Sequence, residues 1–358
     1  MSKVNIDGIL KEWGDKLFYE PVHARRRRRT ATGELLKTVP PNTRSMDAED
    51  KANRVRRMLK LTARKAPEVV IKISGGGKGM KSIKNHFGYI SRNGRLEIED
   101  QDGNKIRGRD EIKDLRDEWK YGKFGISEQS TKKEAFNIIL SMPPGTDREA
   151  VRTAASGFAQ NEFHKNHQYI LVQHEDENHP HVHVCVKARG FDGTRLNPRK
   201  ADLQRWREYF AEKLREQGIE ANATRRPVRF VTKKHTRQQI LHMEKSGRKT
   251  NALNAQREAV YSELKEGKKQ PNPLREKIID TRASIKKAYS EITNVLSRSE
   301  DPKDKALATE VKEFVGRVKP PKTRREEAVD KFRNEKERYL GKTIDNKIKE
   351  ETKEPKIK

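Results

Sequence analysis

The residues best suited to chemistry in this sequence are three histidines close together near its middle. His181 and His183 are separated by one valine, and His174 lies seven residues before His181. Side chains on a β-strand alternate between its two faces, so the imidazoles of His181 and His183 share a face if they lie on a strand. Their separation, roughly 6–7 Å at the backbone, suits two ligands of one metal ion.

These histidines fall within a predicted β-hairpin. Residues 169–174 and 181–186 have the composition of strands, and the polar, proline-containing residues 175–180 form the turn. If His174 pairs with His181 across an antiparallel hairpin, all three imidazoles share one face, with facing Cβ atoms roughly 5 Å apart. A lone histidine on a strand is usually a solvated polar residue, but three at this spacing beside three carboxylates predict an open, catalytic metal site.

Two other residues of the hairpin are candidates for supporting roles. The carboxylate of Asp176 can accept a hydrogen bond from a ligand imidazole and so orient it, as metal-bound histidines usually require. His179 lies in the turn, where it is either a neighbour of the metal ligands or a loop histidine without a role.

Composition points to a polyanionic partner. The chain has 358 residues, 37% of them charged and 32% hydrophobic, and a formal net charge of +28. Nucleic acid is the first candidate for such a chain, and the charge disfavours a hydrolase of small molecules. An anionic membrane surface is a second, but the sequence has no apolar run long enough to span a bilayer and no apolar signal-peptide core. The single cysteine, Cys185, excludes an internal disulfide framework and suits a reducing cytoplasm.

The chain divides into three predicted parts. Residues 1–65 form a basic N-terminal arm that includes five consecutive arginines, Arg25 to Arg29, which are suited to phosphate contact or to keeping the chain soluble. Residues 66–230 form a globular domain of strands and helices. Residues 231–358 are rich in Lys, Glu, Arg and Ala and form a helical, highly charged C-terminal extension.

Individual elements follow from periodicity and turn residues. Strands are predicted at 67–73 and 135–140 besides those of the hairpin, helices at 80–91, 147–163 and 202–217, and a turn or hairpin tip at 97–103. Residues from there to 132 are polar and give no clear prediction. In the C-terminal part, helices are predicted near 250–266, 273–298, 303–317 and 323–350. The glycine-rich loop 74–79 is expected to bring the amino end of the following helix close to phosphate.

Two motifs of the predicted globular domain resemble those of the P-type mobilisation relaxases in the HUH endonuclease superfamily. The resemblance is strongest to the branch that nicks the borders of Ti-plasmid DNA. Residues 136–145 followed by a helix and then by His-x-Asp-x-x-His-Pro-His-x-His at 174–183 carry the resemblance, and residues 88–94 are typical of the first motif of the group. It covers about residues 66–230. It implies an α+β fold with a central antiparallel sheet and flanking helices, to which the helical extension is added.

The resemblance also implies roles for single residues. Tyr89 matches the nucleophilic tyrosine, Ser141 the serine that helps to hold DNA near the nick, His174, His181 and His183 the metal ligands, and Asp176 the acid that accompanies them. Without the histidines, Tyr89 would be read as a packed helix aromatic. One position departs from the pattern: Lys187 stands where many relatives have an asparagine.

The implied reaction is strand-specific nicking and rejoining of single-stranded DNA at a transfer origin. Tyr89 attacks a phosphodiester, forming a 5′-phosphotyrosyl link and releasing a 3′-hydroxyl, which initiates conjugative transfer. Ligand softness alone favours Zn²⁺, Mn²⁺ or Ni²⁺, whereas the resemblance and cellular abundance favour Mg²⁺ or Mn²⁺. Basic residues near Tyr89 in sequence, including Lys78 and Arg92, are expected to contact phosphates. Asp176, His179 and solvent all stay candidates for the group that removes the tyrosine proton.

Partners and alternatives follow from the same reasoning. A relaxase of this kind implies an accessory relaxosome protein, a type IV coupling protein, and a location in the cytoplasm of a bacterial donor cell, with export attached to the DNA. A rolling-circle replication initiator or transposase would place its tyrosine downstream of the histidine motif, whereas Tyr89 lies upstream. A non-catalytic nucleic-acid-binding protein with a metal site would bind without cleaving, and its binding would survive chelation.

Overall fold

The computed structural model describes residues 3–19, 47–231, 238–248, 251–266, 273–323, 325–330 and 332–334. The chain forms two compact units. The first comprises Met1–Arg225 with Ser290–Phe314, and the second comprises Arg226–Tyr289 with Val315–Lys358. The predicted boundaries at residues 66 and 231 stay predictions.

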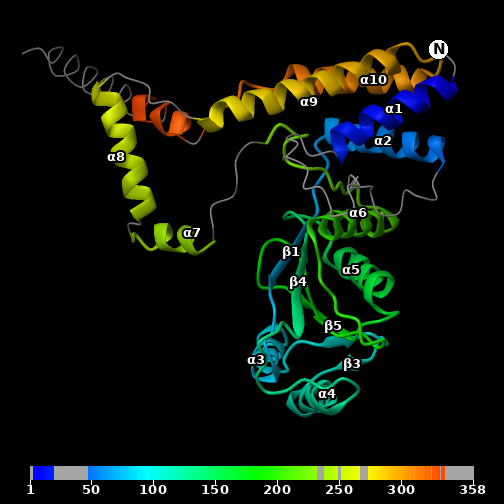
Figure 1. Cartoon of the computed structure of the whole chain (residues 1–358), viewed down its shortest axis with the longest axis vertical. Helices are drawn as coiled ribbons and strands as arrows, with labels where there is room; N and C mark the ends of the chain where they lie inside the picture. Colours follow the sequence, from blue (N-terminus) through cyan, green and yellow to red (C-terminus); the bar gives the residue numbers. More distant parts are fainter. Residues whose placement is uncertain are drawn as a thin grey trace, which may run out of the picture. The chain divides into compact units, whose positions relative to one another are not determined.

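A six-stranded antiparallel sheet forms the centre of the first unit (Figure 1). Its order is β1-β4-β6-β5-β2-β3, and every pairing between neighbouring strands is antiparallel. The strands are β1 (Val70–Gly75), β2 (Ile98–Asp100), β3 (Lys105–Ile106), β4 (Ala135–Ser141), β5 (Tyr169–His174) and β6 (His181–Lys187). The α+β prediction with a central antiparallel sheet is therefore confirmed, and so is the hairpin of β5 and β6.

Helices cover the sheet because its strands bury apolar side chains toward two hydrophobic cores. In one core, Leu140 of β4 packs with side chains of α5 (Arg148–Phe163) and α6 (Lys200–Glu216), among them Phe158 and Trp206. In the other, Ile170, Val172 and Cys185 belong to the same cluster as side chains of α3 (Met80–Ile90) and α4 (Arg109–Tyr121). Within it the rings of Phe87 and Trp119 meet edge to face, with centroids 5.0 Å apart.

Local signals placed most of these elements correctly. Asp147 caps α5 by accepting a hydrogen bond from the backbone NH of Ala150 at 2.7 Å, and α6 ends just before Gly218, whose φ of +79° suits glycine. Helix α4 was not expected. Its apolar residues Ile112, Leu115 and Trp119 have helical spacing, but they are separated by charged residues that hide the pattern in the sequence.

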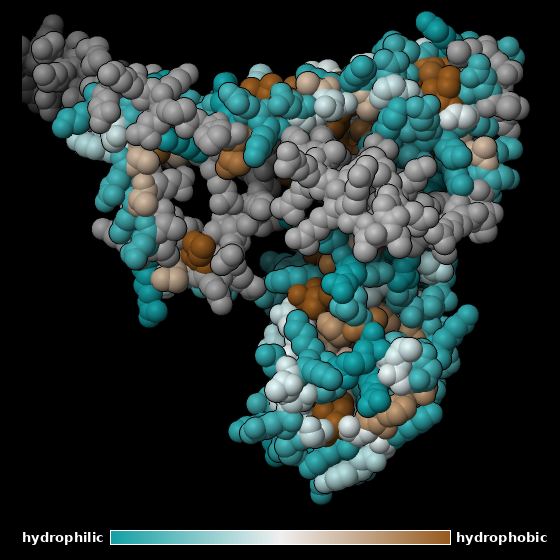
Figure 2. All heavy atoms as spheres, in the orientation of Figure 1, coloured by the Kyte–Doolittle hydropathy of each residue, from teal (hydrophilic) through white to brown (hydrophobic). Residues whose placement is uncertain are grey.

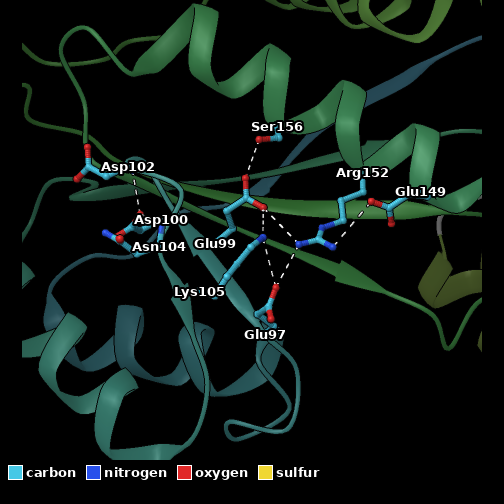
Figure 3. Close-up of polar contacts among 9 residues, drawn as sticks. All are labelled: Glu97, Glu99, Asp100, Asp102, Asn104, Lys105, Glu149, Arg152 and Ser156. Atoms are coloured by element: carbon cyan, nitrogen blue, oxygen red, sulfur yellow. Dashed lines mark hydrogen bonds and ion pairs between the residues drawn. The ribbon is translucent and has the colours of Figure 1, made fainter. Parts of the chain in front are cut away.

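The β2–β3 hairpin at the sheet edge is tied to α5 by a polar cluster (Figure 3). The carboxylate of Glu99 accepts hydrogen bonds from Lys105 at 2.5 Å and from the Ser156 hydroxyl at 2.7 Å. Arg152 of α5 lies 3.2 Å from Glu97 and 3.4 Å from Glu99. These charged contacts fix the edge of the sheet against the helix.

Two helices that the sequence analysis did not predict precede the sheet. They are α1 (Lys3–Phe18) and α2 (Ala48–Ala63), whose first turn is capped by Asp47. Arg54 of α2 pairs with Glu208 of α6, and Asn222 donates a buried hydrogen bond to Thr62 at 3.1 Å. The arginine run 25–29 lies outside the described residues.

The C-terminal part is helical, as predicted. Its helices are α7 (Gln238–Lys245), which was not predicted, α8 (Asn251–Glu266), α9 (Pro273–Ser297) and α10 (Pro302–Gly316). On the face drawn in Figure 2, hydrophilic residues predominate over the coloured part of the chain. Within the described ranges, no helix combines the length and the apolar character needed to cross a bilayer.

Candidate active site

Tyr89 lies in the last turn of α3, beside the end of the sheet that carries the histidines. Its ring centroid is 5.9 Å from that of His174 and 5.9 Å from that of His183. The side chain is 54% exposed, although it is an aromatic residue on a helix whose opposite face is buried. A packed helix aromatic would be covered, so the exposed phenol is available to a ligand.

The chain leaves α3 through an unusual turn immediately after Tyr89. Arg92, Asn93 and Gly94 have φ angles of +52°, +58° and +88°, so three consecutive residues are left-handed. This conformation is strained for residues other than glycine. Backbone NH groups of the turn bond back to α3, including Asn93 to the Gly88 carbonyl at 2.8 Å. The turn directs Arg92 back over the tyrosine, with its guanidinium carbon 5.0 Å from the ring centroid.

The three histidines lie together because of strand register. His174 pairs with His181 between β5 and β6, and Ser141 of β4 pairs with His181 on its other side. Paired residues face the same side of a sheet, so Ser141, His181 and His174 form one row and His183 lies in the next. One ligand atom from each histidine lies within 4.8 Å of the others, and all three side chains are buried.

Hydrogen bonds fix two of the imidazoles. The Nε2 of His174 donates to the carbonyl of Ile90 at 2.8 Å, and the Nδ1 of His181 donates to the carbonyl of His179 at 3.2 Å. Since a carbonyl only accepts, the second nitrogen of each ring keeps its lone pair. The buried Nδ1 of His183 has no hydrogen-bond partner among the described residues. Backbone carbonyls that orient imidazoles are typical of metal sites.

Burial favours the neutral form of His183 and His174. Burial lowers the pKa of His183 to about 3, with the neighbouring histidines and Arg92 acting in the same direction. Burial also lowers the pKa of His174, where Arg92 and His181 add to the effect. Metal ions bind the neutral imidazole, so the three-histidine arrangement fits a divalent cation without competition from a proton at these two rings near neutral pH.

Arg92 and Asp176 form an ion pair at the mouth of the histidine cluster. Although partial burial opposes the shift, the Arg92 guanidinium lowers the pKa of the Asp176 carboxyl. Asp176 also lies 3.8 Å from the Nδ1 of His174, and Arg92 lies 3.5 Å from the same atom. A carboxylate held ionised in this way is suited to orienting charged groups, and less suited to removing a proton.

The remaining predicted residues are not all at the site. His179 is exposed in the turn, with its ring centroid 5.5 Å from that of His181. Lys78 precedes the first turn of α3, so it lies roughly 13 Å or more along the helix axis from Tyr89. The amino end of α3 is therefore not where the tyrosine is, contrary to the expected role of the glycine-rich loop. Lys187 is buried and donates to the Lys123 carbonyl and to Gln168, away from the histidines.

His86 belongs to the site and was missed in the sequence. Its ring centroid is 6.2 Å from that of Tyr89 and 6.4 Å from that of His183. Its Nε2 is buried without a hydrogen-bond partner among the described residues, and burial, with a contribution from His174, lowers its pKa to about 4. Helical spacing was the available signal, because residues 86 and 89 are neighbours on one face of a helix.

Comparison with known proteins shows what this segment is similar to. The family model "Relaxase: MobA/VirD2-like, nuclease domain" matches residues 89–219. The T-DNA border endonuclease VirD2 of Rhizobium radiobacter is 29% identical over 188 residues, which are 47% of this chain and 44% of that protein. The protein of the same name from Agrobacterium fabrum is 29% identical over 187 residues, covering 47% of this chain and 42% of its own.

The chain thus spans less than half the length of these curated relatives. The matched segment begins at Tyr89 and contains Ser141, Asp176 and the three clustered histidines. It is similar to the nuclease domain of the MobA/VirD2-like relaxases, and the resemblance indicated by the sequence motifs is confirmed.

Proposed function

We propose that this protein nicks and rejoins single-stranded DNA at a transfer origin, with Tyr89 as the nucleophile. The observation that carries the proposal is the exposed Tyr89 ring, 5.9 Å from the rings of both His174 and His183, in a segment similar to a relaxase nuclease domain. Nicking in this way starts conjugative transfer of a plasmid or another mobile element. An accessory relaxosome protein and a type IV coupling protein are the proposed partners, and the cytoplasm of the donor cell is the proposed location.

In the proposed reaction the phenolic oxygen of Tyr89 attacks the phosphorus of one phosphodiester. A bond forms between that oxygen and phosphorus, and the bond from phosphorus to the 3′ oxygen breaks. The proton lost by the phenol is balanced by the proton that the released 3′-hydroxyl gains. Because one phosphodiester replaces another, the reverse reaction can rejoin the strand.

His174, His181 and His183 would hold a divalent ion, with Mg²⁺ or Mn²⁺ proposed for the cell. When bound, such an ion polarises the phosphate and stabilises developing negative charge. The neutral imidazoles of His174 and His183 fit this role, and the unpartnered Nδ1 of His183 is the kind of buried atom that ligation satisfies. Arg92, over the tyrosine ring and beside the histidines, adds a positive charge where the phosphate must lie.

Covalent capture tests the proposal. The protein is incubated with Mg²⁺ or Mn²⁺ and supercoiled DNA carrying the transfer origin of its own element, and then denatured. The expected product is nicked DNA with protein on its 5′ end, lost when Tyr89 is changed to Phe and kept when the exposed Tyr121 is changed to Phe. An adduct that persists in Tyr89→Phe would exclude Tyr89, and DNA binding without any cleavage would favour a non-catalytic protein.

A further inference from the structure

A cavity beside Tyr89, whose lining does not include the three clustered histidines, is lined by positive charge. It has a volume of about 760 Å³ and lies between the last turns of α3, the turn after Tyr89, and α4. Its lining includes Tyr89 and the cations Lys84, Arg92, Arg109, Lys113 and Arg116. Of the residues that line it in the described part of the chain, none is acidic.

Several of these cations lack a carboxylate partner. Arg92 pairs with Asp176, and Arg116 lies 3.4 Å from its sequence neighbour Asp117. No ion pair joins Lys84, Arg109 or Lys113 to an acid in the ranges that the structure describes. Clustered cations without partners repel one another, and an anionic ligand removes that repulsion.

The charge pattern of α4 supports a ligand in this cavity. Arg109, Lys113 and Arg116 lie on one face of the helix, at spacings of four and three residues. Acids of the same helix, such as Asp110 and Asp114, fall on other faces. Like charges therefore stand four residues apart both among the cations, as in Arg109 and Lys113, and among the acids, as in Asp110 and Asp114. Such pairs destabilise a helix, whereas alternating charges would stabilise it. Lys113 also has Asp110 and Asp117 at helical spacing, but the row of cations lines the cavity, where a bound polyanion would offset the repulsion among them.

The cavity is also held in place relative to Tyr89. The NH of Gly108, the N-cap residue just before α4, donates to the carbonyl of Gly94 at 3.1 Å. A Cβ atom at Gly94 would lie only 2.8 Å from the Gly108 carbonyl carbon. The left-handed turn and the start of the helix are therefore too close for any residue with a side chain at this position. Together with the contact of Phe87 and Trp119, this contact fixes α4 beside the tyrosine.

We propose that this basic cavity binds the sugar–phosphate backbone of the DNA strand next to the phosphate that Tyr89 attacks. The inference rests on the proposed function, because it takes the strand at Tyr89 to be single-stranded DNA. The charge of the lining gives affinity for phosphates without a base preference, and Tyr89 and Arg92 belong both to this lining and to the site beside the histidines.

Binding of a fluorescent oligothymidylate, measured by anisotropy over a range of salt concentrations, tests the cavity. The triple variant Arg109→Gln, Lys113→Gln, Arg116→Gln is compared with Lys123→Gln, Lys132→Gln, Lys165→Gln, which removes the same charge at exposed lysines outside the lining. The cavity variant is expected to bind at least tenfold more weakly than this control at low salt. Its salt dependence should fall by about 2 in the slope of log K against log salt, since each single-strand contact contributes about 0.7.

Thermal unfolding of both variants checks that any loss of binding does not come from a loss of folding. Because neutralising the like charges removes repulsion in α4, the melting temperature of the cavity variant is expected to be equal to or higher than that of the wild type. Equal affinities of the two triple variants would overturn the inference. Pyrophosphate binding that is lost in the cavity variant, with unchanged strand affinity, would assign the cavity to a small phosphate compound and also overturn it.

The proposed function fails in a different way. If the wild-type protein forms no adduct while the cavity variant still loses strand binding, the cavity stands and the nuclease does not. If the adduct forms but the cavity variant binds like its control, the nuclease stands and the cavity assignment is wrong.

Discussion

His174 connects the two halves of the site at the scale of single residues. Its ring belongs to the histidine cluster, and its Nε2 bonds to the carbonyl of Ile90, the residue that follows Tyr89. One hydrogen bond thus joins the helix of the proposed nucleophile to the proposed metal ligands. The orientation of the His174 ring is therefore coupled to the position of the helix end that carries Tyr89.

Metal binding should stabilise the folded protein through these histidines. Adding Mn²⁺ to chelator-treated protein at about 100 times its dissociation constant is expected to raise the free energy of unfolding by about 2.7 kcal/mol. The His183→Ala variant should lose this increment, because it removes one of three buried ligands. The exposed His179 provides the matched control, and His179→Ala should keep the increment. Thermal unfolding with and without Mn²⁺ measures both, and an unchanged increment in His183→Ala would contradict the assigned ligand set.

His86 should contribute to the rate and not to metal binding. Its pKa of about 4 keeps the ring neutral, with one donor and one acceptor nitrogen beside Tyr89. We propose that His86 hydrogen-bonds to the charged groups that develop during the reaction; such a bond is worth about 1.5–3 kcal/mol, so His86→Phe should slow adduct formation roughly tenfold to a hundredfold. Single-turnover capture of a labelled origin strand measures the rate, and the Mn²⁺ increment in stability should not change. A wild-type rate would mean that His86 only packs in the site.

The sequence predicted some of these residues better than others. His174, His181 and His183 were predictable because a strand period of two and a short turn leave little freedom in where their side chains point. The position of Arg92 over the tyrosine depends on a left-handed turn that asparagine and glycine permit but do not require. His86 was missed because its helical spacing from Tyr89 shows that the two are neighbours, but does not show that they face the histidines of the sheet.

At the scale of elements, the polar cluster between the β2–β3 hairpin and α5 should give a pH-dependent part of stability. Burial opposes ionisation of Glu99, but the hydrogen bonds from Lys105 and Ser156 outweigh it and lower the pKa of Glu99 below its ordinary 4.5. The stabilisation is therefore present above that value and is lost as the pH falls through the lower pKa of the folded state.

Replacing Glu99 by Gln should lower the free energy of unfolding by about 1 kcal/mol at pH 7, since solvent screens part of the cluster. The loss should shrink toward zero in acid, where the wild-type carboxyl is also protonated. Urea unfolding at pH 7 and near pH 3 measures the difference, with the exposed Glu149→Gln as the control for Arg152 contacts. The same loss at both pH values would show that Glu99 acts through packing instead of charge.

The sequence analysis missed helices mainly where charged residues separate the apolar residues that have helical spacing. The strands of the sheet are dense in Val, Ile and Leu, so they stand out in a chain with this composition. Helices α1, α2 and α4 bury single apolar residues between charged ones, and their cores are completed by distant parts of the chain. Such helices are stabilised by tertiary packing, which a local pattern does not show.

At the scale of the whole molecule, α10, which is distant in sequence from α1 and α2, is linked to both of them through ion pairs of α2 within the first unit. Arg56 of α2 pairs with Asp7 of α1 at 2.7 Å and with Asp304 of α10 at 2.8 Å. Arg64 of α2 pairs with Glu310 of α10 at 2.9 Å. Deleting everything after residue 231 would therefore remove a helix that packs on α2. A loss of nicking after that deletion would report the missing packing, and not a role of the extension in catalysis.

The buried pair of Arg56 and Asp304 offers a sharper test of this arrangement than a deletion. Asp304 is 3% exposed, so Asp304→Asn leaves the Arg56 charge short of one partner away from solvent. Because Arg56 is partly exposed and keeps its contact with Asp7, the change is expected to lower the free energy of unfolding by about 2 kcal/mol, the worth of a hydrogen bond to a charged group. The exposed Glu300→Gln, just before the same helix, should change stability by less than about 0.5 kcal/mol. Urea unfolding compares the two, and equal small effects would mean that α10 does not pack on α2 as the pair requires.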